Sequence, residues 1–188
     1  MVRKDVVAYL SEHVTVRQWT EKEKMPKELL KEWLREADGL WSINHFMVDE
    51  DLVKDAPNLK VIAQASVGYD NIDIDALTAR NIPYGNTPDV LTETTAELAF
   101  TLMAAASRRI YENAQFVKDG KWVERPSNIK GKDLSRMTLG IIGMGKIGVS
   151  VSRRARAFGM TVQYHNRHRR NDDSLLMTTY VSLGKLLT

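Results

Sequence analysis

A glycine-rich segment in the second half of the chain has the residue spacing of a phosphate-binding loop. In the pattern G-x-G-x-x-G, the first glycine permits a tight turn, the second lets the backbone approach a pyrophosphate, and the third lets a helix pack closely on a strand. The following helix offers unpaired N–H groups to the phosphates. The segment therefore predicts dinucleotide binding, and it consists of Gly143, Met144, Gly145, Lys146, Ile147 and Gly148.

The residues on either side of this loop strengthen the interpretation. Thr138–Ile142 has the composition of a short buried strand, and Val149–Phe158 has a helical pattern. A glycine pattern alone is weak evidence, but one placed between a strand and a helix is much more specific. The alternative is an ordinary glycine-rich turn with no ligand.

A basic turn follows the next predicted strand, Thr161–Tyr164, where an acidic residue usually accepts hydrogen bonds from the adenosine ribose. Asn166 and Arg167 stand there instead, followed by Arg169 and Arg170. Because a guanidinium forks onto a phosphate, Arg167, assisted by Arg169 or Arg170, could hold a 2′-phosphate. The turn therefore favours NADP(H), with NAD(H) also possible, and the alternative is a solvated basic turn.

Alternation of short apolar runs with helical patterns over the first 90 residues indicates an α/β fold with a parallel sheet. Only three residues separate the apolar segment Asp5–Leu10 from the next predicted strand, too few for a parallel crossover, so we interpret it as a helix. The strand that would normally precede this helix is then expected to be missing. We expect strands at Val14–Val16, Gly39–Ile43 and Val61–Ala65, and helices at Lys27–Ala37, Asp49–Ala56 and Ile72–Asn81.

A long amphipathic helix is predicted after Thr87. Thr94 and Glu97 could form a capping box, and Asp119-Gly120 would end the helix. If continuous from Thr94 to Lys118, it would be roughly 37 Å long, enough to pass from one domain into another. After the strands expected at Thr138–Ile142 and Thr161–Tyr164, we expect a third strand at Thr179–Leu183 and then the first turn of another helix.

Composition and charge narrow the classes of function. The 188 residues include no cysteine, which excludes disulfides and thiolate metal ligands. We find no secretory signal and no apolar stretch long enough to span a bilayer, and we expect a cytoplasmic protein. Residues 1–100 have a net charge of −7 and residues 101–188 one of +10, which suggests an anionic partner. Since no nucleic-acid motif accompanies the arginines, we favour a phosphorylated cofactor over nucleic acid.

Three motifs in order resemble the D-isomer-specific 2-hydroxyacid dehydrogenases. They are residues 65–73 (ASVGYDNID), residues 86–99 (NTPDVLTETTAELA) and residues 139–148 (LGIIGMGKIG). The second motif looks closest to glyoxylate/hydroxypyruvate and 2-ketogluconate reductases. The resemblance implies a flavodoxin-like substrate domain at residues 1–92, lacking its first strand, and the first half of a Rossmann dinucleotide-binding domain at residues 93–188. It also implies reduction of a small 2-oxo acid, such as glyoxylate or hydroxypyruvate, to the D-2-hydroxy acid, and a homodimer built on the long helix and the arm through Trp122.

The same resemblance implies roles for particular residues. The backbone amides of Val67 and Gly68 would hold the substrate carboxylate, and Thr95 would lie near the cofactor. The Lys146 and Ile147 amides would cap the pyrophosphate, and the Asn166-Arg167 turn would meet the adenosine. For Asp70 and Asp73 we favour turn and helix-cap bonds over catalysis.

The chain also departs from the family pattern. The family's substrate-binding Arg, its catalytic His and the Glu beside that His all lie beyond the adenosine turn, and Thr188 is only 18 residues past Arg170. None of His13, His45, His165 and His168 lies in the family's catalytic motif, so we assign no catalytic residue and expect surface or turn roles. We therefore expect an incomplete chain that is inactive alone, and the alternative function is a catalytically silent nucleotide-binding or dimerising fragment.

Overall fold

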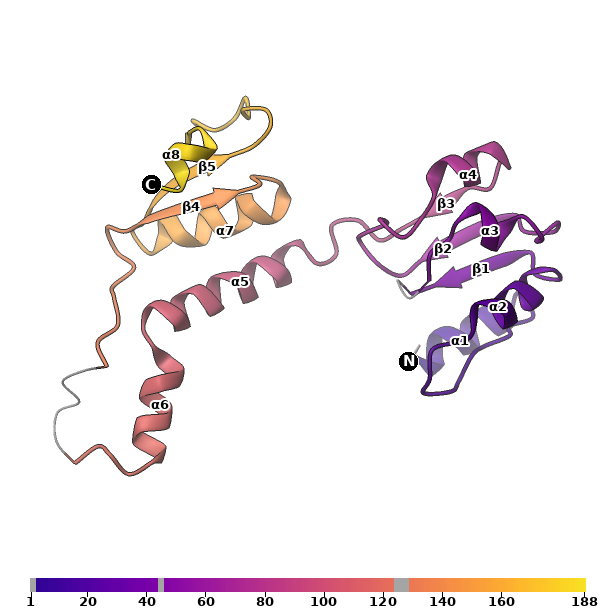
Figure 1. Ribbon diagram of the computed structural model, residues 1–188, viewed down its shortest axis with the longest axis horizontal. Helices are drawn as coiled ribbons and strands as arrows, with labels where there is room; N and C mark the ends of the chain where they lie inside the picture. The colour runs from indigo at the N-terminus through magenta and orange to yellow at the C-terminus, as the bar shows by residue number, and fades with distance from the viewer. Residues whose placement is uncertain (1–2, 44–45, 124–128) are drawn as a thin grey trace. The chain divides into compact units, whose positions relative to one another are not determined.

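The computed structural model describes residues 3–43, 46–123 and 129–188 (Figure 1). The chain divides into two compact units, an N-terminal unit, Met1–Pro88, and a C-terminal unit, Asp89–Thr188. Each combines a three-stranded parallel sheet with α-helices, which confirms the predicted α/β class. Among the described helices, none is long and apolar enough to cross a membrane.

The sheet of the N-terminal unit has the strand order β1-β2-β3, with β2 in the middle. Burial alternates along β2, where Ile62 and Gln64 are buried while Val61 and Ala63 are exposed, as expected for a strand with one covered face. Apolar side chains from three helices pack with Ile62 to form the core on the covered face. The elements of this unit are α1 (Lys4–Ser11), α2 (Lys27–Leu34), β1 (Gly39–Ser42), α3 (Glu50–Val53), β2 (Val61–Gln64), α4 (Ile74–Ala79) and β3 (Tyr84–Gly85).

One prediction for this unit is wrong, and one of its strands was not predicted. The strand expected at Val14–Val16 is wrong, because these residues follow α1 as irregular chain. Their β-branched composition favours a strand, but no described strand lies beside them and Val14 is exposed. The two-residue strand β3 was not predicted, since it is too short to show a pattern, and it adds to the sheet by pairing Ile62 with Tyr84.

The sheet of the C-terminal unit has the order β4-β5-β6. Its β4 and β5 pair in parallel from Thr138 with Thr161 to Ile142 with His165, and the connection between them is the predicted helix. Phe100, Ala155, Val162 and Tyr164 share the core with Met144 of the glycine-rich loop. The elements are α5 (Thr92–Ser107), α6 (Ile110–Lys118), β4 (Thr138–Ile142), α7 (Lys146–Ala157), β5 (Thr161–His165), β6 (Thr179–Tyr180) and α8 (Leu183–Leu186).

The long helix is not continuous, so the predicted length of 37 Å is wrong. It breaks between α5 and α6, where Arg109 adopts a left-handed φ of 51° (Figure 1). Ser107 explains the break: its carbonyl accepts the Lys132 N–H at 2.8 Å, and its hydroxyl donates to the Lys132 carbonyl at 2.9 Å. An ion pair between Arg108 and Asp133 holds the same crossing. The irregular segment around Lys132 thus ends α5 through a long-range contact that periodicity does not report.

The ends of the two helices also bear on the predicted caps. Helix α5 begins at Thr92, and its N-cap position is Leu91, which makes no side-chain cap bond, so the Thr94 capping box is wrong. At the other end, Gly120 adopts a φ of 67° just after α6, as predicted for a helix stop.

Candidate coenzyme and substrate sites

The glycine-rich loop joins β4 to α7, as the sequence predicts. Gly143 has a φ of 95°, a backbone conformation that residues other than glycine rarely adopt. Gly145 is the N-cap of α7. A Cβ atom at Gly148 would lie 2.5 Å from the Gly143 carbonyl oxygen. Gly148 therefore lets the first turn of α7 approach the end of β4, which is the packing role predicted for the third glycine.

Three consecutive backbone amides at the start of α7 are available to a ligand. Within the described chain, no group accepts a hydrogen bond from the N–H of Gly145, Lys146 or Ile147. A Cβ at Gly143 or Gly145 would meet nothing within 4 Å, so the loop leaves open space in front of these donors. Unpaired N–H groups at a helix N-terminus attract anions, and the residues present fit the pyrophosphate of a dinucleotide.

The first two amides of the loop are already bonded. Gly143 donates its N–H to the His165 carbonyl at 3.0 Å, and Met144 donates its N–H to the Asn166 side-chain oxygen at 2.6 Å. The Met144 side chain is buried in the core. Met144, predicted as a cofactor-binding residue, thus offers no free N–H, and its position in the loop is fixed by the end of β5.

The basic turn after β5 contains two local ion pairs that the sequence analysis missed. Arg169 pairs with Asp173 at 2.7 Å, and Arg170 pairs with Asp172 at 2.7 Å. Each guanidinium holds the pKa of its aspartate below the ordinary value. Arg167 is exposed, and its side chain has no bonding partner in the described part of the chain. The spacings i,i+4 and i,i+2 in RRNDD could have signalled these pairs.

The predicted substrate loop follows β2 and presents its amides in the same way. The Ser66 carbonyl accepts the Thr87 N–H at 3.0 Å, and the Val67 carbonyl accepts the Asn86 side-chain amide at 2.9 Å. The Gly68 carbonyl accepts from the buried Gln64 side chain at 2.7 Å. With these carbonyls held, the N–H groups of Val67 and Gly68 have no partner among the described residues, an arrangement suited to a carboxylate.

Polar side chains around this loop were missed by the sequence reasoning. Gln64 also donates to Ser66 and to Asn71, and Asn71 donates to the Phe46 carbonyl at 2.7 Å. A glutamine at an inward position of an otherwise apolar strand was the available signal, because buried amides need partners. Asp73 caps α4 by accepting the Ala76 N–H at 2.9 Å, which confirms the predicted capping role.

Thr95 lies on the exposed side of the first turns of α5. This end of α5 is tied to α7, because the Ser150 hydroxyl donates to the Glu93 carboxylate at 2.8 Å and Arg154 pairs with it at 3.0 Å. The pKa of Glu93 is lowered by the hydrogen bond from the Ser150 hydroxyl and, to a smaller extent, by the hydrogen bond from Arg154. Lys146 forms a further ion pair with Asp89. The structure thus holds the start of α5 against α7, the helix whose first N–H groups are unpartnered.

The described histidines contact neighbouring groups of the fold or lie at the surface. His13 contacts the ring of Tyr9, and His168 is exposed. His165, the last residue of β5, is half-buried, with its Nδ1 3.0 Å from the Val181 carbonyl oxygen. His45 lies outside the described residues. No cluster of three potential metal ligands occurs among the described residues.

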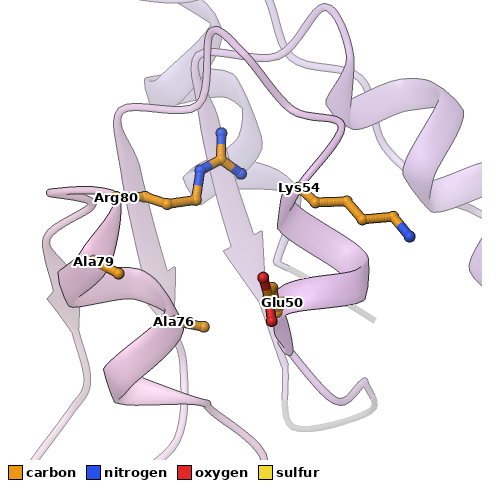
Figure 2. Close-up of a pocket in the computed structure, with 5 residues that line it drawn as sticks. All are labelled: Glu50, Lys54, Ala76, Ala79 and Arg80. Carbon is orange, nitrogen blue, oxygen red and sulfur yellow. The ribbon is translucent and has the colours of Figure 1, made fainter.

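A separate pocket lies between α3 and α4 and contains none of the predicted site residues (Figure 2). Two of its three charged side chains have partners, although the buried Nη1 atom of Arg80 has none among the described residues. Lys54 pairs with Asp51 at 2.8 Å, and Arg80 donates to the Ala56 carbonyl at 3.0 Å. The Lys54 side chain points away from the other lining residues, which are Glu50, Ala76, Ala79 and Arg80.

Comparison with known proteins now identifies the family. The model of the D-isomer specific 2-hydroxyacid dehydrogenase catalytic domain matches residues 1–173. The chain belongs to the D-isomer-specific 2-hydroxyacid dehydrogenases. A glyoxylate reductase of this kind from Korarchaeum cryptofilum is 42% identical over 181 residues, which are 95% of this chain and 54% of the relative. This dehydrogenase chain thus spans about half the length of the curated relatives it matches.

Solved structures agree with the family assignment. The TT0316 protein from Thermus thermophilus has a TM-score of 0.86 and 37% identity, covering 100% of this chain and 59% of that one. A D-lactate dehydrogenase from Aquifex aeolicus, complexed with NAD and lactic acid, has a TM-score of 0.84 and 29% identity, covering 99% and 56%. The predicted fold class and family are therefore confirmed.

Proposed function

We propose that this chain supplies the coenzyme-phosphate site and the substrate-carboxylate loop of an NAD(P)H-dependent reductase. The substrate would be a small 2-oxo acid such as glyoxylate or hydroxypyruvate, and the product its D-2-hydroxy acid. The observation that carries the proposal is the set of three unpartnered amides at Gly145, Lys146 and Ile147, in front of open space at the start of α7. Relatives named glyoxylate reductases support the substrate class.

Each unit has its own task in this proposal. When bound, the nicotinamide supplies the hydride that reduces the 2-oxo carbon. The α7 amides bind the pyrophosphate, while the Val67 and Gly68 amides bind the substrate carboxylate. Thr95, on the helix end tied to α7, contacts the coenzyme. The N-terminal unit is thus the substrate domain and the C-terminal unit the coenzyme domain, with the boundary at residue 92 or a few residues earlier.

We propose NADP(H) as the preferred coenzyme, with NAD(H) also accepted. The exposed and unpartnered Arg167 supports this preference, because its guanidinium is free to pair with a 2′-phosphate. Asn166 replaces the acidic residue that would repel that group. The preference is thus a matter of charge at the adenosine end.

We further propose a cytoplasmic homodimer. Large apolar side chains are exposed along α5 and α6 and in the arm after α6, more than a monomer usually presents on one segment. These side chains are Leu98, Leu102, Ile110, Tyr111, Val117, Trp122 and Val123. A second copy of the chain would cover them.

Titration of the 188-residue protein with NADPH and NADH by isothermal calorimetry tests the proposal. We expect both coenzymes to bind and NADPH to bind more tightly. We expect no hydride transfer with glyoxylate or hydroxypyruvate from this chain alone, because none of its four histidines lies in the family's catalytic motif and none is assigned the protonation of the carbonyl oxygen. Absence of binding by either coenzyme would refute the proposed site, and NADPH oxidation by glyoxylate would show that these residues include the catalytic machinery.

A further inference from the structure

Both backbone polar groups of Met144, in the middle of the phosphate-binding loop, are held by the turn after β5. Its N–H donates to Asn166 Oδ1 at 2.6 Å, and its carbonyl accepts from Arg170 Nη1 at 3.1 Å. Its side chain is buried, with 1% exposed. The loop residue next to the free amides is therefore fixed on three sides, and two of the three contacts come from a segment more than twenty residues away.

The other two nitrogens of the Arg170 guanidinium are also bonded. Nε and Nη2 both bond the Asp172 carboxylate at 2.7 Å, a bidentate geometry that fixes the guanidinium plane. The Arg170 backbone N–H donates to the Tyr164 hydroxyl at 2.9 Å, and Tyr164 is fully buried. Arg170 is thus paired with a carboxylate and anchored through both its guanidinium and its backbone.

Arg169 is engaged in the same way. Its Nε donates to Asp173 at 2.7 Å, and Asp173 is buried, with 5% exposed. Arg167 differs from both, since its side chain has no partner within the described chain. The three arginines of this turn therefore fall into two anchored residues and one free cation.

We propose that Asn166 and Arg170 are positioning residues that hold the phosphate-binding loop through Met144, and that Arg167 alone discriminates the 2′-phosphate. This inference rests on the proposed coenzyme site. The orientation of the Asn166 amide supports it, because only its oxygen can accept the Met144 N–H. Loss of Asn166 or Arg170 then weakens the binding of any dinucleotide, whereas loss of Arg167 weakens only that of the phosphorylated one.

Two charge-matched variants of the 188-residue chain, Arg167→Gln and Arg170→Gln, separate these roles. Calorimetry with NADPH and NADH, which differ only in the 2′-phosphate, measures both affinities. We expect Arg167→Gln to lower the NADPH affinity about tenfold or more, as for loss of a charged hydrogen bond, and to leave the NADH affinity unchanged. We expect Arg170→Gln to lower both by a similar factor, so that their ratio stays that of the wild type.

Two variants at Asn166 test the positioning role without changing an arginine. Asn166→Ala removes the acceptor for the Met144 N–H and should weaken NADH binding, whereas Asn166→Asp keeps an acceptor and should restore it. A purely structural effect would lower the melting temperature without this rescue. The inference is overturned if Arg170→Gln weakens NADPH selectively, or if it leaves both affinities unchanged. Wild-type protein that binds neither coenzyme would instead refute the proposed function, and this inference with it.

Discussion

Substitution of Gly148 by alanine should destabilise the C-terminal unit. The added Cβ would lie 2.5 Å from the Gly143 carbonyl oxygen, so one of two backbone segments must move by about 0.9 Å to reach the 3.4 Å of an ordinary contact. Overpacking of this kind costs about 1–3 kcal/mol. Alanine is favoured over glycine in a helix by about 1 kcal/mol, which offsets part of that cost. We expect a net loss of up to about 2 kcal/mol, or up to roughly 16 °C in Tm for a unit of this size.

Gly145→Ala is the matched control, with the same added methyl group three residues earlier. Gly145 has φ −82° and ψ −162°, which alanine adopts readily, and its Cβ would meet nothing within 4 Å. Stability should therefore stay within about 1 kcal/mol of wild type. The methyl group would occupy the space that a pyrophosphate needs, so the NADPH affinity should fall by about tenfold or more, equivalent to about 1.4 kcal/mol.

The two effects need separate assays. Because a chain of two units need not unfold in one step, hydrogen exchange of residues 138–160 should accompany calorimetric melting and assign the loss to the C-terminal unit. NADPH titration below the melting transition gives the affinity. Wild-type stability of Gly148→Ala would show that the loop relaxes at little cost. Wild-type NADPH binding by Gly145→Ala would show that the pyrophosphate does not approach this residue.

Three further changes are predicted. Asp51 contacts Lys31, Lys54 and Lys27, which lower its pKa from the ordinary 3.8. The contribution of this carboxylate to stability is therefore complete above that pH and is lost as the pH falls below it. The urea midpoints of wild type and Asp51→Asn should differ at pH 7 and converge in acid, and a constant difference would contradict this. Ser150→Ala removes a buried donor to Glu93 and should lower the melting temperature by about 2–6 °C, whereas an unchanged value would show that Arg154 suffices. Leu102→Lys, at a side chain that is 60% exposed, should preserve folding but yield a monomer in light scattering if the proposed dimer uses α5, and a persistent dimer would place the contact elsewhere.

The strand-loop-helix around Gly143–Gly148 was predictable because its signals are local. Three glycines with distinct backbone requirements lie between a β-branched run and a helical pattern, and the structure places β4 and α7 there. The helix at Asp5–Leu10 followed from a length limit on crossovers, and α1 occupies it. Local pattern thus predicted the elements that carry the proposed coenzyme site, and chain geometry predicted α1 in the N-terminal unit.

Two predictions, the continuous long helix and the strand at Val14–Val16, were wrong because local sequence does not report contacts between residues far apart in the chain. Nothing within Thr94–Lys118 signals the break at Arg109, because the group that ends α5 is Lys132. At Val14–Val16 the composition suits a strand, but no strand among the described residues lies beside this segment to pair with it. In both cases tertiary context overrode local propensity.

The positive charge of the C-terminal half shows the same limit in electrostatics. Counting residues shows a net charge of +10 over residues 101–188 but does not show which cations are free. In the structure, every described carboxylate after residue 100 is ion-paired with an arginine or lysine of the same unit; these acids are Glu112, Asp119, Asp133, Asp172 and Asp173. Helix α5 engages further cations, since Glu93 pairs with Arg154 and, just before the helix, Asp89 pairs with Lys146. An anionic ligand would therefore meet a field shaped by the cations left over, and in the turn after β5 the arginine without a described partner is Arg167.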